Sequence, residues 1–233
     1  MKEKKVFYFN KIYNAKNRYK KPKEIFQFLV KKLKIDKVKK NSSLIDIGCS
    51  NGELLFNLSK NFSFKLTGID VDKNLLIKAK KNCPSEVSFF HKDISKKNLK
   101  LKKYDIVVLS GVLSIFKDGK NILKNVLKLV KPKGVIYIFD SLNIYSYNLH
   151  IKANKLEKGR EVNWYKNMYS TDYIKKFFGR YNKKCKFFQF RMKKNIKKDK
   201  SNLNYGWTEI LSGKKIITSG LGLIQNQFWV KIK

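Results

Sequence analysis

The sequence has few of the residues that build disulfide frameworks and metal sites. Its 233 residues include three cysteines, Cys49, Cys83 and Cys185, and only two histidines. The cysteines are scattered without metal-ligand spacing, and no Asp/His cluster with such spacing is present in the sequence. We therefore expect reduced thiols, no disulfide framework and no bound metal.

Long apolar runs are also missing. Hydrophobic residues make up 42% of the chain, which is enough for a folded core, and the length fits one α/β domain with a modest insertion. No apolar run approaches the roughly 18 residues that span a membrane. The residues after Met1 lack the apolar core of a signal peptide. These features predict a cytoplasmic protein that does not associate with membranes.

Arginine is scarce although the charge is extreme. The formal net charge is +37, and it comes almost wholly from lysine, since the chain has only four arginines, Arg18, Arg160, Arg180 and Arg191. A nucleic-acid surface typically clusters its cations and uses arginine for bidentate phosphate contacts. Here the lysines spread over nearly every expected element. We favour lysine-rich composition at solvated positions over a dedicated nucleic-acid surface, and both interpretations stay open.

The most informative stretch that is present covers residues 44–55. The apolar run Leu44–Ile47 predicts a strand buried on both faces, Gly48 to Gly52 form a turn, and Glu53 begins a helix. This arrangement lets backbone amides and the helix dipole face a ligand at close range, because glycine adds no side chain.

A second predicted strand, 65–70, ends on Asp70. A carboxylate at this position can accept hydrogen bonds from both ribose hydroxyls of an adenosine ligand. Dinucleotide-binding turns carry Gly-x-Gly-x-x-Gly, whereas this chain has Ser50 in place of the middle glycine. The pattern Asp-x-Gly-Cys-Ser-x-Gly, followed by Gly-Ile-Asp, resembles the class I S-adenosylmethionine-dependent methyltransferases, and the resemblance extends over residues 44–140.

The resemblance implies an enzyme, S-adenosylmethionine as its cofactor, and a set of residues that bind it. In the family, an acidic residue after the third strand holds the adenine amino group and the next apolar side chain packs on the ring. An arginine or tyrosine of an N-terminal arm often meets the methionine carboxylate; for Arg18, an ordinary surface position is the alternative. The cofactor-binding candidates are Arg18, Tyr19, Asp46, Gly48, Cys49, Ser50, Gly52, Asp70, Val71, Asp93, Ile94 and Ser110.

Periodicity predicts alternating strands and helices, hence a parallel sheet with right-handed crossovers. We predict an α/β fold: a Rossmann-like, seven-stranded, mostly parallel sheet with helices on both faces. The resemblance implies that the last strand is antiparallel. The expected strands are 44–47, 65–70, 86–91, 104–110, 135–140, 186–191 and 226–232, and the expected helices are 22–35, 53–58, 72–80, 118–130 and 170–178.

A single methyltransferase domain is expected over 1–233. Its parts are an N-terminal arm and helix (1–40), a cofactor-binding core (41–140), substrate-side loops with a helix and a strand (141–225), and the final strand (226–233). Residues 141–169 and 201–222 are expected as long loops rich in aromatic side chains or glycine. Ligands of open α/β sheets bind at the carboxyl ends of the strands, so these loops should lie over the site.

The loops supply the candidates for the acceptor side. His150 is the best-placed base by sequence, with Tyr145 and Asp140 behind it, although a lone histidine in such a loop is also compatible with no catalytic role. No Asn-Pro-Pro-Tyr or Asp-Pro-Pro-Tyr sequence, which many base-amino methyltransferases carry, follows the fourth strand. The catalytic candidates are His150 and Tyr145, and the substrate candidates are Asp140, Tyr147, Trp164 and Trp207.

Three functional interpretations remain. The leading one is methyl transfer to a small molecule, such as the hydroxyl or amine of a sugar or other metabolite, because the loops are aromatic and polar like a pocket. The second interpretation, an RNA methyltransferase, is supported by the charge alone, since the sequence contains no separate RNA-binding module. A non-catalytic cofactor-binding protein is the third, since a fold does not guarantee activity.

Overall fold

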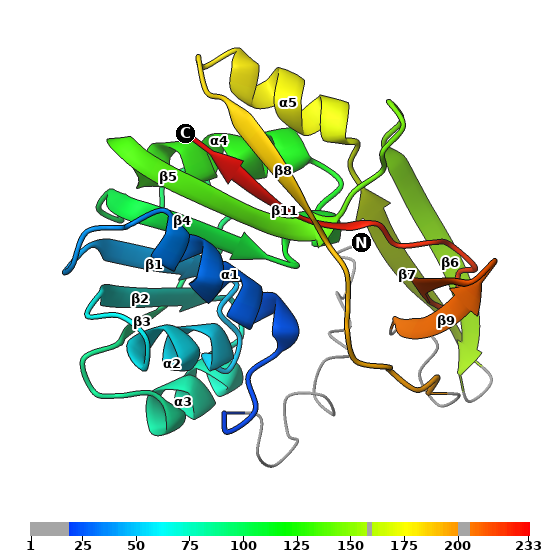
Figure 1. Ribbon diagram of the computed structural model, residues 1–233, viewed down its shortest axis with the longest axis horizontal. Helices are drawn as coiled ribbons and strands as arrows, with labels where there is room; N and C mark the ends of the chain where they lie inside the picture. The colour runs from blue at the N-terminus through cyan, green and yellow to red at the C-terminus, as the bar shows by residue number, and fades with distance from the viewer. Residues whose placement is uncertain (1–18, 158–159, 200–205) are drawn as a thin grey trace.

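The computed structural model describes residues 19–157, 160–199 and 206–233. A seven-stranded sheet forms the centre of the molecule, in the order β3-β2-β1-β4-β5-β11-β8 (Figure 1). Neighbouring strands from β3 to β5 are parallel, whereas β11 is antiparallel to both β5 and β8. The strands are β1 (Ser43–Ile47), β2 (Lys65–Asp70), β3 (Ser88–His91), β4 (Tyr104–Ser110), β5 (Val130–Ser141), β8 (Cys185–Phe190) and β11 (Gln227–Ile232).

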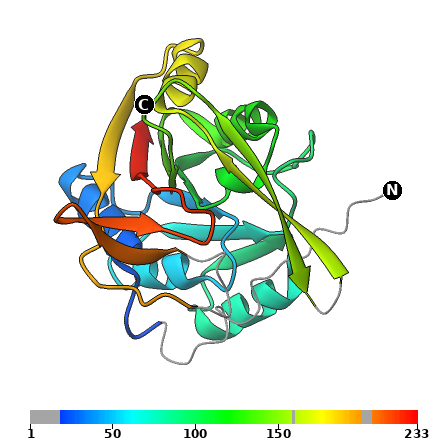
Figure 2. The same cartoon turned by 90° about the vertical axis from the view of Figure 1, so that its right-hand side faces the viewer.

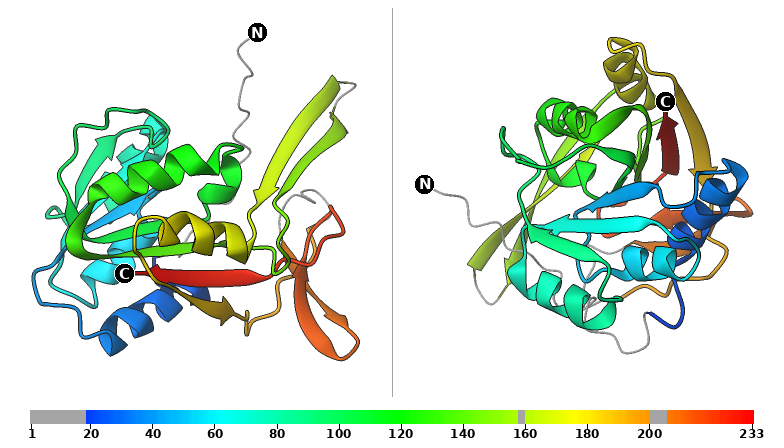
Figure 3. Two further views of the ribbon diagram at one scale, coloured as in Figure 1. Left: turned by 90° about the horizontal axis from the view of Figure 1, so that it is seen from above. Right: turned by 90° about the vertical axis from the view of Figure 1, so that its left-hand side faces the viewer.

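Helices cover both faces of the sheet, and each face has its own apolar core (Figures 1 and 3). Successive strand residues point to opposite faces, so Leu44 packs with α1, α2 and α3 while Ile45 packs with α4 and α5. The helices are α1 (Glu24–Ile35), α2 (Glu53–Ser59), α3 (Lys73–Asn82), α4 (Gly119–Leu129) and α5 (Thr171–Gly179), with a short 3₁₀ turn η2 (Leu113–Ile115). The predicted fold class is confirmed.

Local sequence determines where several helices begin. Asp72 caps α3, as predicted, by accepting hydrogen bonds from the amides of Asn74 (2.8 Å) and Leu75 (3.2 Å). Asp118 and Ser170 cap α4 and α5 in the same way, accepting from the amides of residues 121 (3.1 Å) and 173 (3.0 Å). Within the described ranges, no helix is long and apolar enough to cross a membrane.

The two predicted long loops are wrong, because each contains a two-stranded antiparallel hairpin. Residues 141–169 contain β6 (Leu149–Glu157) and β7 (Arg160–Met168), and residues 201–222 contain β9 (Trp207–Leu211) and β10 (Lys214–Thr218). Such ribbons bury little apolar surface, so their strands lack the apolar runs that identify strands of a core. For β9–β10 a signal existed: Ser212 (φ 47°) and Gly213 (φ 71°) form a two-residue turn.

The start of β5 also differs from the prediction. Residues 131–134 were expected to separate the helix from a strand beginning at Val135, yet β5 begins at Val130, which pairs with Tyr104. The register shifts between Tyr104 and Ile106, and this irregularity accommodates Pro132, which cannot donate to a ladder.

Both hairpins lie beyond the carboxyl ends of β1, β4 and β5 (Figures 1 and 2). Figure 3 (left) shows them projecting from the same side of the molecule. The insertions after β5 and β8 therefore border the carboxyl ends of the parallel strands, which is where this class of sheet binds ligands.

Candidate active site

The turn between β1 and α2 is tied to the neighbouring strand through its backbone. The amides of Gly48 and Cys49 both donate to the carbonyl of Ile69, at 2.8 and 3.0 Å. Gly48, Ser50 and Gly52 have positive φ values of 71°, 52° and 83°. A Cβ atom on Gly48 would lie 2.4 Å from Cγ2 of Val112, so glycine is required there for both conformation and space.

Asp70 lies opposite this turn, at the carboxyl end of β2. One carboxylate oxygen accepts from the amide of Ser50 (2.8 Å) and the other from the amide of Asp72 (2.9 Å). Burial raises the pKa of Asp70, and these backbone hydrogen bonds oppose the rise. Each carboxylate oxygen keeps a second lone pair, so Asp70 can also accept hydrogen bonds from ligand hydroxyls.

A cavity of about 290 Å³ lies over the ends of β1, β2 and β4. The η2 turn and its flanking residues close one side of it, through Val112, Ile115 and Phe116. Seven of the predicted cofactor-binding residues line this cavity: Gly48, Ser50, Asp70, Val71, Asp93, Ile94 and Ser110. The structure thus brings together residues that lie as far apart in sequence as 48 and 110.

A second cavity of about 200 Å³ adjoins the first and shares Gly48, Ser50, Ser110 and Gly111 with it. It is lined additionally by two predicted residues, Asp46 and Cys49. Gly52 lines neither cavity; a Cβ atom there would meet Sγ of Cys83 at 2.8 Å.

The surroundings of Asp46 and Cys49 favour the protonated form of both side chains. Burial and the neighbouring charge of Asp70 raise the pKa of Asp46 well above its usual range, against the opposing charge of Lys23. Burial, with the charges of Asp46 and Asp70, likewise raises the pKa of the Cys49 thiol. These effects favour the neutral thiol over the thiolate at physiological pH.

We expect Asp46→Asn to stabilise the protein by roughly 1 kcal/mol at pH 7, because a buried carboxyl with a raised pKa costs the folded state free energy whether it ionises or takes up a proton. A carboxyl whose folded pKa is raised destabilises the folded state above that pKa and has no such effect below the unfolded value of 3.8. The advantage of the variant should therefore vanish as the pH falls toward 4. Urea unfolding of both proteins across this range measures it, and an equal advantage at every pH would contradict the assignment.

The N-terminal candidates lie differently from the prediction. Tyr19 donates a hydrogen bond of 2.6 Å to the carbonyl of Asn51, and its ring packs edge-on against Phe56 at 5.2 Å. It holds the outside of the β1–α2 turn and lines neither cavity. Arg18 lies outside the described residues. Cofactor contacts of both residues stay predictions.

A hydrogen-bonded chain connects the β6–β7 hairpin to the wall of the first cavity. His150 Nδ1 lies 2.7 Å from Oδ1 of Asn167, and Nδ2 of Asn167 donates to the carbonyl of Ser114 at 3.0 Å. With the amide oriented in this way, Nδ1 of a neutral His150 carries the proton and Nε2 keeps its lone pair. Tyr169 adds a second link, since its hydroxyl donates to carbonyls of residues 116 and 117.

Asp140 lies beneath this chain, at the end of β5. Its carboxylate accepts from the amides of Ser114 and Ser141, each at 2.9 Å. Burial raises the pKa of Asp140, with these hydrogen bonds and the charge of Lys166 opposing. The side chain is buried and positions the η2 turn; a direct contact with substrate stays a prediction.

Among the described side chains, no acceptor-side candidate, His150 and Asp140 included, lines either cavity, and the His150 side chain is exposed. Tyr145 and Tyr147 are 69% and 73% exposed in the segment between β5 and β6. Trp207 is 4% exposed, so it offers little surface to a substrate, and its indole donates to Glu209 at 2.5 Å. The backbone of Trp164 pairs with Ala153 in the hairpin, and its side chain is outside the described set. The roles of all four stay predictions.

Sequence reasoning missed Asn167 and Lys166 on β7. Burial lowers the pKa of the Lys166 amine, and the charge of Asp140 opposes this. No local signal distinguishes this lysine from the many solvated ones, because its burial depends on the hairpin folding back over the end of β5. Asn167 could have been found only by recognising the hairpin, whose register places it opposite His150.

Fold and site together define the architecture of a class I, Rossmann-like methyltransferase. Residues 38–204 match the family model described as "Methyltransferase domain", which is well over half of the chain. The chain belongs to this family. The predicted fold and family, an enzyme class that uses S-adenosylmethionine, are thereby confirmed.

Curated relatives match about half of the chain. The protein-lysine N-methyltransferase EFM4 of Saccharomyces cerevisiae is 28% identical over 136 residues, 52% of this chain and 59% of that protein. The ubiquinone biosynthesis O-methyltransferase of Coxiella burnetii is 26% identical over 107 residues, 45% of each chain. The chain thus spans about half the length of the curated relatives it matches.

Solved structures resemble the whole fold. An S-adenosylmethionine-dependent methyltransferase from Clostridium acetobutylicum has a TM-score of 0.59 at 16% identity and covers 97% of both chains. A DhpI–SAH complex has a TM-score of 0.60 at 12% identity, covering 89% of this chain and 83% of that one. At these identities the likeness shows the fold alone.

Proposed function

We propose that this protein binds S-adenosylmethionine in the adjoining cavities over β1, β2 and β4 and transfers its methyl group to a small-molecule acceptor. The observation that carries the proposal is the Asp70 carboxylate facing the positive-φ turn at Ser50, with Asp93 and Ile94 in the same cavity. Asp70 would hold the ribose, and Asp93 with Ile94 would hold the adenine.

The protein's own residues need to position the two reactants and, for some acceptors, to remove a proton. When bound, S-adenosylmethionine supplies a methyl group already activated by the sulfonium. The chain's residues position the acceptor for in-line attack and, for a weakly acidic hydroxyl or an ammonium, take up the proton. Ser110, which lines both cavities, marks where the reacting groups would meet.

His150 is the base we propose. Asn167 orients its ring, and the same amide is anchored to the η2 turn that carries cavity-lining residues. The proton on Nδ1 is engaged by Asn167, so Nε2 can accept a proton from an acceptor hydroxyl or amine. Tyr169 supports the ring edge-on at 6.2 Å.

The β6–β7 and β9–β10 hairpins at the carboxyl ends of the parallel strands favour a small acceptor. Both hairpins lie beyond the strand ends (Figure 2), and the hydrogen bonds through Asn167 and Tyr169 fix β7 against the cavity wall. A sugar or other metabolite hydroxyl or amine suits a polar hairpin at the strand ends better than an extended polymer does. The EFM4 relative makes protein lysine the competing acceptor to test.

The test is transfer of a labelled methyl group from S-adenosylmethionine into separated metabolite, protein and RNA fractions of a cell extract. We expect label in the metabolite fraction. Label confined to protein or RNA would overturn the small-molecule acceptor, and failure to bind S-adenosylmethionine at all would overturn the function.

For the base, we expect His150→Gln to lower the methyl-transfer rate by roughly a hundredfold or more while cofactor affinity is unchanged. The matched control is His91→Gln, which changes the other histidine, an exposed side chain outside both cavities. Steady-state rates and calorimetric titration separate the two effects. Equal rates for both variants would remove His150 from the mechanism.

A further inference from the structure

Another cavity lies at the opposite end of the sheet from the candidate active site. It has a volume of about 560 Å³ and is bordered by the α1–β1 loop, the starts of β4 and β5, and the end of β11. The seven residues of β4 separate the two sites by about 20 Å, at roughly 3.3 Å per residue. The proposed methyl-transfer chemistry uses none of the residues that line this 560 Å³ cavity.

Its lining is strongly cationic. Six lysine and two aspartate side chains line it, which gives a formal side-chain charge of +4; they are Lys37, Lys39, Lys131, Lys133, Lys231, Lys233, Asp36 and Asp105. Lysine ammonium groups that lie close together in a concave site repel one another, because the local dielectric constant is lower than in water. A bound anion reduces this repulsion.

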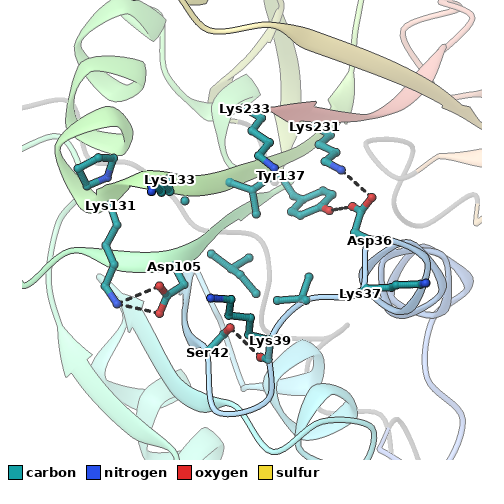
Figure 4. Close-up of a pocket in the computed structure, with 15 residues that line it drawn as sticks. Asp36, Lys37, Lys39, Ser42, Asp105, Lys131, Lys133, Tyr137, Lys231 and Lys233 are labelled. Carbon is teal, nitrogen blue, oxygen red and sulfur yellow. Dashed lines mark hydrogen bonds and ion pairs between the residues drawn. The ribbon is translucent and has the colours of Figure 1, made fainter.

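The two carboxylates are already committed to particular lysines (Figure 4). Nζ of Lys131 lies 2.9 Å from both oxygens of Asp105, and Nζ of Lys231 lies 2.6 Å from Asp36. Partial burial would raise the pKa of Asp105, but hydrogen bonds from Ser43 and Lys131 outweigh it and lower the pKa to about 2. Burial would likewise raise the pKa of Asp36, but hydrogen bonds from Lys231 and Tyr137 outweigh it and lower the pKa, so both carboxylates stay ionised and hold these two lysines at neutral pH.

The other lysines have no such partner. Lys39, Lys133 and Lys233 make no ion pair with any carboxylate among the described residues. Figure 4 shows Lys39 on the lower side of the cavity and Lys133 and Lys233 on the upper side, while Lys37 extends away from it. Three ammonium groups from three separate segments thus surround one opening, an arrangement that suits several anionic oxygens at once.

The walls between these lysines are apolar. Val38 and Val135 are partly exposed and Pro132 is exposed, and all three line the cavity. A ligand here would bury an apolar body against these side chains and direct its charges to the rim.

We propose that this basic pocket binds a compact anion with two or three adjacent phosphate groups on a flat or apolar body, as a nucleoside di- or triphosphate presents. Lys39, Lys133 and Lys233 would contact the phosphates, while Val38, Pro132 and Val135 would contact the body. The site is separate from the methyl-transfer site and does not depend on the proposed function.

The test is calorimetric titration of the full chain with ATP, ADP, AMP and inorganic tripolyphosphate at about 150 mM salt, where diffuse surface charge is largely screened. We expect ATP and ADP to bind and AMP to bind much more weakly. If tripolyphosphate binds as tightly as ATP, the ligand is free polyphosphate rather than a nucleotide, and the same lysines bind it. Absence of binding by all four compounds would overturn the proposal.

The double variant Lys39→Gln/Lys133→Gln should weaken ATP binding by roughly tenfold or more, because two charge-assisted contacts are lost. The matched control, Lys120→Gln/Lys124→Gln, removes two exposed lysines of α4 that do not line the pocket. Both variants should keep wild-type melting temperatures and S-adenosylmethionine affinity, since none of these side chains is buried or lines the cofactor cavities.

Two outcomes would overturn the proposal even if ATP binds. Equal weakening by the control would show that net charge, not the pocket, attracts the anion. Binding of a short RNA that depends on Lys39 and Lys133, without comparable ATP binding, would identify a nucleic-acid surface instead.

Discussion

Replacing Asp70 with alanine is expected to weaken binding of S-adenosylmethionine, or of its demethylated product, by about a hundredfold, because a partly buried carboxylate that accepts charge-assisted hydrogen bonds is lost. The same substitution leaves the amides of Ser50 and Asp72 without their acceptor, so the β1–α2 turn should also lose part of its order. Calorimetric titration with the demethylated product avoids turnover and measures the affinity directly.

The control for Asp70→Ala is Asp172→Ala, which removes a carboxylate from the first turn of α5, outside both cofactor cavities. This variant should bind with wild-type affinity. A folded Asp70→Ala protein with unchanged affinity would show that Asp70 does not hold the ribose, and the assignment of the cavity would fail with it.

Gly48→Ala should be the most damaging single substitution in the turn. The residue has φ 71°, where an L side chain costs about 1–2 kcal/mol. The added Cβ would also lie 2.4 Å from Val112, and such overpacking typically costs about 1–3 kcal/mol. We therefore expect a loss of about 3 kcal/mol in the free energy of unfolding, together with loss of cofactor binding.

Gly213→Ala separates the two causes. Gly213 also has φ 71°, but a Cβ atom there would meet nothing within 4 Å. It should lose only the conformational part, about 1–2 kcal/mol, and bind cofactor normally. Urea unfolding of both variants measures the difference. Equal losses would show that Val112 moves aside without cost and that the contact across the cavity is unimportant.

The two halves of the candidate active site are built in different ways. The methyl-donor half is made of short segments at strand ends, each with its own local requirement for glycine or a carboxylate. The acceptor half is a hairpin held by hydrogen bonds between side chains and distant carbonyls, such as that between Asn167 and Ser114. Substitutions in the first half should therefore alter cofactor affinity, and those in the second should alter turnover.

The amino-acid sequence by itself determined the sheet and the cofactor half of the site. Buried apolar runs define β1, β2 and β4, and Asp72 marks the start of α3, because burial and capping act over a few neighbouring residues. The glycines and Asp70 follow strands whose carboxyl ends necessarily meet at one edge of a parallel sheet. Their proximity could therefore be predicted before the structure was known.

The acceptor side of the site and the basic pocket could be found only from the folded structure. The β6–β7 hairpin is polar, and its register, which places His150 opposite Asn167, depends on cross-strand pairing that leaves no apolar run in the sequence. The basic pocket joins Lys39, Lys133 and Lys233, which are separated by about 100 residues at each step and look like every other solvated lysine. Such sites arise where distant segments pack, and long-range packing is the information that local sequence patterns do not contain.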